Sequence, residues 1–110
     1  MNMLNSIILE GNVKSLPVVG EFENYNGEVS VKSSFPLTVV RELHNEKGES
    51  VFKEEYDFDI ETYGEMAKFC NAHIEEGRGI RVVGRLKQKE GRVFVVAEHI
   101  EIKPARPTKA

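Results

Sequence analysis

Residues 54–86 read EEYDFDIETYGEMAKFCNAHIEEGRGIRVVGRL, and this stretch decides the fold. Apolar side chains recur at every second position in Tyr56, Phe58 and Ile60, which predicts a strand with one buried face. A short helix with a glycine on either side follows, and then a second strand that begins at about residue 80. The stretch therefore predicts the order strand, helix, strand.

The helix is expected over about residues 65–76, with Gly77 as its C-cap. A spacing of 3.6 residues places one set of its side chains toward a core. The members of this set are Met66, Phe69, Cys70 and either His73 or Ile74.

Five strands are expected in all, over about residues 4–14, 28–43, 51–63, 80–89 and 92–102. Val18 and Val19 lead from the first strand to a loop with a hairpin turn at Asn26-Gly27. An all-β chain with one short helix between its third and fourth strands matches the OB-fold, a five-stranded Greek-key barrel. A flat α+β sandwich could use the same elements, but the mid-strand glycines Gly11 and Gly84 favour a closed, sharply bent sheet.

Length and composition predict one soluble domain over residues 1–103 and a short, flexible basic tail over residues 104–110. The apolar content of 40% is ordinary, and no apolar run approaches the length of a membrane span. The N-terminus lacks the basic flank and cleavage site of a signal peptide. Cys70 is the single cysteine, so no internal disulfide can form. We therefore expect a cytoplasmic protein without membrane association.

The net charge of −3 is unevenly distributed along the chain. Residues 41–65 contain nine acids and three bases, whereas residues 78–92 contain six bases and one acid. A polyanion responds to the local potential, so the second segment is the first candidate for binding one. No phosphate-binding loop, nucleophile elbow, catalytic triad or zinc pattern is present, and we expect no catalytic residues, no metal and no cofactor.

Several short motifs resemble those of the bacterial single-stranded DNA-binding protein family, in the family's order and near its spacing. They occupy residues 5–13 (NSIILEGNV), 35–37 (FPL), 63–67 (YGEMA), 77–86 and 95–100 (VVAEHI), and the similarity covers about residues 4–102. The resemblance implies an OB-fold that assembles as a tetramer or a dimer. It also implies binding of single strands without reading their sequence.

Such binding combines basic side chains along the phosphates with aromatic rings on which bases stack. The resemblance places Tyr63 at the family's main stacking aromatic, and Lys87 and Lys89 at its basic positions. Arg85 and Arg81 share the parity of these lysines, so all four cations could line one strand face. The expected nucleic-acid-binding residues are Tyr63, Arg81, Arg85, Lys87, Lys89 and Arg92.

The chain departs from the family at its tryptophans, because Leu43, Asp57 and Gly91 stand at or near the three positions. Tyr63 is then the main stacking platform, with Tyr25 or Phe52 as candidates to assist it. Family members commonly end in a long tail with an acidic tip that recruits other replication proteins. Here residues 104–110 are short and basic.

Three carboxylates, Asp57, Asp59 and Glu61, share the parity of Tyr63 and so belong to the face that the family uses for DNA. Because carboxylates repel phosphates, we expect them to pair with Arg81, Arg85 or cations of a neighbouring subunit, or to form a solvated face. Their ligand type would suit Mg²⁺ or Mn²⁺, but nothing supplies a nucleophile or ligands for a second metal, and no metal site is predicted.

The leading hypothesis is sequence-independent binding of single-stranded DNA in replication, repair or recombination, by a homo-oligomer that also contacts other replication proteins. The alternative is a protein-interaction or primosome-assembly module, similar to the primosomal replication protein, with weak or no nucleic-acid binding. Its partner would dock on the acidic face of the third predicted strand.

Overall fold

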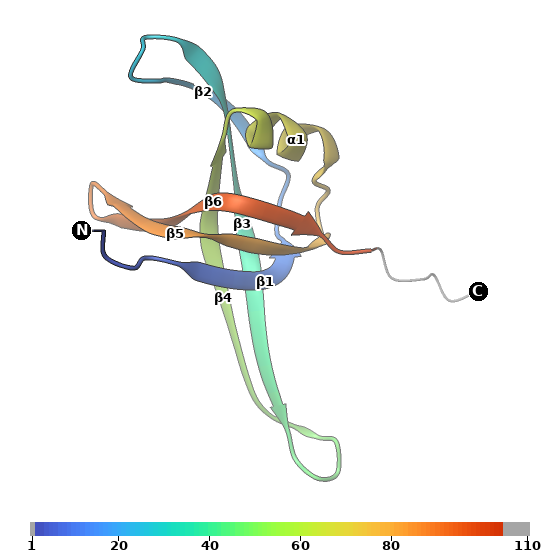
Figure 1. Cartoon of the computed structure of the whole chain (residues 1–110). Coiled ribbons are helices and arrows are strands. Elements are labelled where there is room, and N and C mark those ends of the chain that lie inside the picture. The colour runs from blue at the N-terminus through green and yellow to red at the C-terminus, as the bar shows by residue number, and fades with distance from the viewer. Residues whose placement is uncertain (1, 105–110) are drawn as a thin grey trace.

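The computed structural model describes residues 2–104, which form six strands and one helix (Figure 1). In chain order the elements are β1 (Ile7–Val13), β2 (Val18–Glu23), β3 (Val29–His44), β4 (Ser50–Tyr63), α1 (Glu65–His73), β5 (Gly79–Lys89) and β6 (Arg92–Ile102). The predicted number of five strands was therefore wrong. The predicted tail, residues 104–110, lies outside the described residues except for Pro104.

The additional strand is β2, where the sequence predicted only a short apolar segment at Val18 and Val19 that leads to a loop. It pairs antiparallel with β3 over its full length. In the turn between them, the side-chain oxygen of Asn24 accepts hydrogen bonds from the backbone N–H groups of Asn26 and Glu28. Gly27 has a φ of 79°, as the predicted Asn-Gly turn requires. One glycine and two acidic residues within β2 hid its alternation in the sequence.

The strand pairings close on themselves. β1 pairs with β5 along one edge and with β3 at Asn12 and Val13, so the order β1–β5–β6–β4–β3 returns to β1. β2 is added at the outer edge of β3. The ring encloses a core of buried apolar residues that includes Val13, Phe35, Leu37, Ile60, Ile80, Val82 and Val95.

Two glycines that the sequence places at bends occupy points where backbones approach closely. A Cβ atom on Gly11 would lie 2.2 Å from the carbonyl oxygen of Thr38. A Cβ atom on Gly84 would lie 2.2 Å from the carbonyl oxygen of Val96, at the position where the β5–β6 register shifts. Only a residue without a side chain allows these close crossings.

The helix is shorter than predicted and ends at His73. Ile74 adopts an extended conformation (φ −81°, ψ 123°), and its side chain is only 4% exposed. Gly77 has a φ of 84° and its N–H donates to the carbonyl of Val13, so it turns the chain toward β5 instead of capping the helix. The helix therefore ends at His73, earlier than its apolar spacing predicts, because Ile74 is buried in an extended conformation.

The inward face of α1 also differs in part from the prediction. Cys70 is fully buried and Met66 packs at the edge of the core, as expected. Phe69 is instead 43% exposed and lies against His73, with ring centroids 4.8 Å apart. Ala67 takes the second fully buried position of the helix.

β3 and β4 continue beyond the ring as a long two-stranded arm (Figure 1). The arm, residues 39–56, contains five acids and three bases, so it carries a local excess of negative charge. Within residues 2–104, no helix is long and apolar enough to cross a membrane.

Candidate nucleic-acid interface

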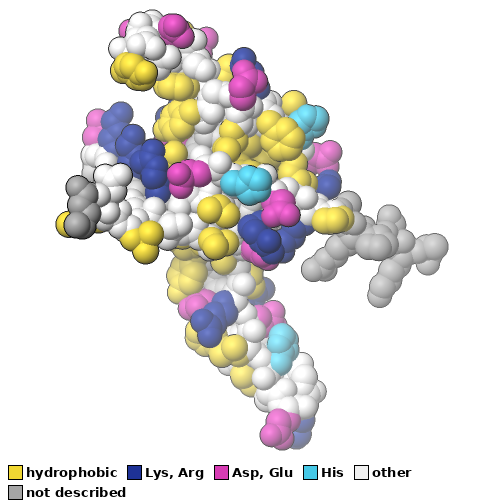
Figure 2. Space-filling model, viewed as in Figure 1, with side chains coloured by type: hydrophobic (Ala, Val, Ile, Leu, Met, Phe, Trp, Pro, Cys, Tyr) yellow, Lys and Arg dark blue, Asp and Glu magenta, His cyan; other side chains and the backbone are white. Residues whose placement is uncertain are grey.

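A hollow lies between the tip of the β5–β6 hairpin and the segments of β3 and β4 around Tyr63, and we call it the basic hollow. Its lining consists of Lys32, Glu61, Tyr63, Lys87, Lys89, Glu90, Arg92 and Phe94. Four of these residues are cations and two are acids. Figure 2 shows Lys and Arg side chains gathered over the β5–β6 hairpin, at the left of the view. The structure thus brings together four of the six predicted site residues.

The β5–β6 hairpin positions its cations by leaving the core after Gly84. Buried and exposed residues alternate along β5 up to this glycine, and the residues from Arg85 to Lys89 are all exposed. Lys89 pairs with Arg92 across the hairpin, so both side chains share one face. The turn at Glu90 and Gly91 has positive φ angles at both positions, which suits a tight two-residue hairpin.

Tyr63 is held from three sides at the end of β4. Its ring packs edge-on against Phe22 of β2 at a centroid distance of 4.9 Å, and the Lys32 ammonium lies 6.0 Å from the ring centroid. Its hydroxyl donates a 2.6 Å hydrogen bond to Glu61. Burial, and then this hydrogen bond, raise the pKa of Tyr63 to about 12. The phenol is therefore protonated and fixed in orientation.

Two carboxylates of β4 contact cations of the basic hollow. Asp59 Oδ2 lies 3.1 Å from Arg92 Nη2, and Glu61 Oε1 lies 3.3 Å from Lys32 Nζ. The predicted pairing of these acids with Arg81 or Arg85 was wrong, because strand register brings different cations beside them. Each pair lowers the positive potential that a polyanion would meet.

The third carboxylate, Asp57, is held away from the hollow. It accepts a 2.6 Å hydrogen bond from Lys14 and a 2.7 Å hydrogen bond from Thr38. These two hydrogen bonds, with that from Lys14 the larger influence, lower the pKa of Asp57 below its usual value. Within residues 2–104, no group of three or more His, Cys, Asp or Glu side chains is placed to hold a metal ion.

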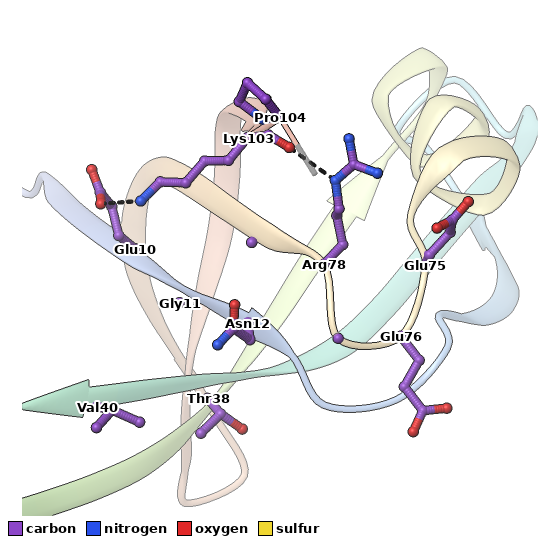
Figure 3. Close-up of a pocket in the computed structure, with 12 residues that line it drawn as sticks. Glu10, Gly11, Asn12, Thr38, Val40, Glu75, Glu76, Arg78, Lys103 and Pro104 are labelled. Carbon is purple, nitrogen blue, oxygen red and sulfur yellow. Dashed lines mark hydrogen bonds and ion pairs between the residues drawn. The ribbon is translucent and has the colours of Figure 1, made fainter. Parts of the chain in front are cut away.

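Arg81 is separated from the other predicted cations. It lies on the same strand face as Arg85, but at the opposite end of β5, where it contacts Glu10 (2.5 Å) and Glu101 (3.6 Å). Figure 3 shows Lys103 on the same carboxylate of Glu10, so this end of β5 is a closed network of ion pairs. Arg81 thus lies outside the basic hollow.

Arg85 does not line the hollow, yet its charge acts on it. The positive charge of Arg85 opposes the rise in the pKa of Tyr63, although burial and Glu61 outweigh it.

Comparison with known proteins gives a match in structure but not in sequence. No protein-family model and no curated protein matches the chain. Among solved structures, a complex of Plasmodium falciparum SSB with single-stranded DNA superposes with a TM-score of 0.73 at 16% identity, covering 94% of this chain and 98% of that one. The single-stranded DNA-binding protein from Thermus aquaticus superposes with a TM-score of 0.70 at 23% identity, covering 94% of this chain.

A deletion mutant of the Thermus aquaticus protein gives a TM-score of 0.69 at 22% identity, again over 94% of this chain. The chain has the OB-fold of these single-stranded DNA-binding proteins. It spans about half the length of the Thermus aquaticus chain, which it covers to 52%. The fold expected from the sequence motifs is thereby confirmed, with β2 as an additional strand.

Sequence reasoning missed two residues of this OB-fold site. Lys32 reaches the hollow because β3 pairs with β4 in the register that sets Lys32 opposite Tyr63. Phe22 supports Tyr63 from β2, the strand that the sequence did not predict. The sequence offered one signal for β2: Val18, Gly20 and Phe22 recur at every second position, as on one face of a strand. Tyr25 and Phe52, expected as helpers, lie instead in the β2–β3 turn and on the β3–β4 arm.

Proposed function

We propose that this protein binds single-stranded DNA without reading its sequence, in DNA replication, repair or recombination. The observation that carries the proposal is the convergence of Lys32, Lys87, Lys89 and Arg92 around the Tyr63 ring on an OB-fold. Lys87, Lys89 and Arg92 would follow the phosphates, with Lys32 held by Glu61 beside the ring, while a base stacks on the tyrosine, a contact worth about 1–3 kcal/mol. Arg85 would add to the local positive potential, and no catalytic step is proposed.

Titration of a fluorescein-labelled oligo-dT at low salt tests this proposal by anisotropy. We expect binding at micromolar protein or below, and a loss of at least tenfold when Lys87→Glu and Lys89→Glu are combined. The matched control combines Lys47→Glu on the arm with Lys68→Glu on α1. It changes the net charge by the same amount as the test variant, but away from the basic hollow. No binding by the wild type, or equal losses in the two double variants, would refute the proposal.

We propose that the protein acts as a homo-oligomer, a dimer or a tetramer. Within the described residues, β1 pairs with β3 only at Asn12 and Val13, so residues 7–11 have one open strand edge. Ile8 beside that edge is 65% exposed and Leu4 is 95% exposed. Open edges with apolar neighbours favour strand pairing between copies. Light scattering after size exclusion should give a mass above that of one chain, and Ile8→Lys should reduce it.

We place the protein in the cytoplasm, where the lone buried thiol of Cys70 suits a reducing environment. The alternative of a protein docked on the β4 carboxylates has less support. Asp57, Asp59 and Glu61 each contact a cation of the same chain, which leaves little uncompensated charge for a basic partner. Other replication proteins remain proposed partners through surfaces outside the basic hollow.

A further inference from the structure

We infer that Asp59 is a built-in competitor of DNA phosphates for Arg92, so that Arg92 joins a bound strand only by exchanging one anionic partner for another. This inference rests on the proposed function, because it concerns how the cations of the basic hollow engage a strand. It assigns to Asp59 the role of a positioning residue that acts through Arg92.

The contact between Asp59 and Arg92 has the features of an exchangeable one. A single nitrogen of the guanidinium meets a single carboxylate oxygen at 3.1 Å, although arginine can form two parallel bonds with a carboxylate or a phosphate. The side chains remain 58% and 55% exposed, and ion pairs this accessible to water are weak. The guanidinium also lies 5.3 Å from the ring centroid of Phe94, which keeps it over the hollow whichever anion it meets.

The neighbouring pair of Lys32 and Glu61 has the opposite features. The Glu61 side chain is only 7% exposed, and its two oxygens are both engaged, one with Lys32 and one with the Tyr63 hydroxyl. Removing Lys32 to a phosphate would leave a buried carboxylate without its cation, which is costly. Lys32 therefore stays with Glu61, and Asp59 is the carboxylate that DNA displaces.

The remaining cations of the hollow, Lys87 and Lys89, bind the strand before Arg92 exchanges its partner. Within residues 2–104, neither Lys87 nor Lys89 forms an ion pair, so both ammonium groups are available to an arriving strand. Once they hold it, further phosphates of the same strand are present beside Arg92 at high effective concentration. Arg92 then exchanges Asp59 for phosphate. A single phosphate lacks this anchoring, so the site favours a strand over isolated anions.

Comparison of Asp59→Asn with Glu101→Gln tests the exchange, because each variant removes one carboxylate from an arginine of the β5–β6 region. Labelled oligo-dT is titrated over a range of salt concentrations. We expect Asp59→Asn to bind about two- to fivefold more tightly at low salt. The plot of log affinity against log salt should keep nearly the same slope, because Arg92 contacts a phosphate in the complex of either protein, whereas one further phosphate contact on a single strand would steepen it by about 0.7. Glu101→Gln should change the affinity by less than twofold.

A double-mutant cycle shows whether the gain passes through Arg92. In an Arg92→Ala background, Asp59→Asn should give no gain in affinity. A gain that persists there, an equal gain in Glu101→Gln, or weaker binding by Asp59→Asn would each overturn the exchange. Absence of DNA binding by the wild type and by every variant would instead refute the proposed function, and the inference with it.

Discussion

Replacement of Gly84 by alanine should destabilise the fold strongly, because the new methyl group would meet backbone rather than a movable side chain. Its Cβ would lie 2.2 Å from the Val96 carbonyl oxygen and 3.2 Å from the Ala97 Cα. An ordinary contact begins at 3.4 Å, so β5 and β6 must separate by 1.2 Å at this point. No rotamer change relieves the overlap.

The expected cost combines two effects. Overpacking of a close contact costs about 1–3 kcal/mol, and weakening of adjacent ladder hydrogen bonds costs about 1 kcal/mol each. The sum is about 3 kcal/mol or more. For 110 residues, an unfolding entropy of about 2.1 cal/mol/K per residue converts each 1 kcal/mol into about 4 °C. Gly84→Ala should therefore lower Tm by about 12 °C, measured by circular dichroism.

Gly20→Ala is the matched control in β2. Its Cβ would lie 3.9 Å from the nearest atom, the Lys32 Cβ, which is an ordinary contact. Because alanine reduces the freedom of the unfolded chain, this variant should keep or raise Tm by a few degrees. If Gly84→Ala unfolds at the temperature of Gly20→Ala, the close crossing of β5 and β6 is refuted.

The other predictions concern the site and its surroundings. Tyr63→Ala should weaken oligo-dT binding by about 1–3 kcal/mol, whereas Tyr25→Ala, in an exposed turn, should leave it unchanged; equal losses would contradict stacking on Tyr63. Arg81→Ala should change DNA affinity less than Lys87→Ala at the same salt concentration, because Arg81 lies in an ion-pair network outside the hollow; the reverse order would show that the far end of β5 binds the strand. Hydrogen bonds from Lys103 and Arg81 lower the pKa of Glu10 below 4.5, so its stabilising effect is present above that pH and is lost as the pH falls through the lowered value. The urea midpoint of Glu10→Gln should accordingly fall less than that of the wild type between about pH 7 and pH 3, and identical acid profiles would contradict this role.

Local patterns predicted the elements nearest the site well. β5 and β6 were expected over residues 80–89 and 92–102, and they span Gly79–Lys89 and Arg92–Ile102. Alternating side chains and the Glu90-Gly91 turn are short-range signals, so they can be read without knowing the rest of the molecule. The gathering of Lys87, Lys89 and Arg92 around one hollow follows from the same signals.

Contacts between distant segments were predicted poorly. The end of α1 was misplaced because the burial of Ile74 against strands far along the chain outweighed the local helical pattern. β2 was missed because its pairing with β3, rather than its own composition, makes it a strand. Propensity is a weak signal when tertiary contacts oppose it.

The sequence by itself determined which side chains share a strand face, because alternation and tight turns depend on neighbouring residues alone. It thereby grouped Tyr63 with the β4 carboxylates, and Arg85 with the lysines of β5. Only the tertiary structure decided which charges meet: Asp59 with Arg92, Glu61 with Lys32, and Arg81 with Glu10. Those partners depend on the register between strands and on where the sheet crosses itself, and both are set by contacts between residues far apart in the chain.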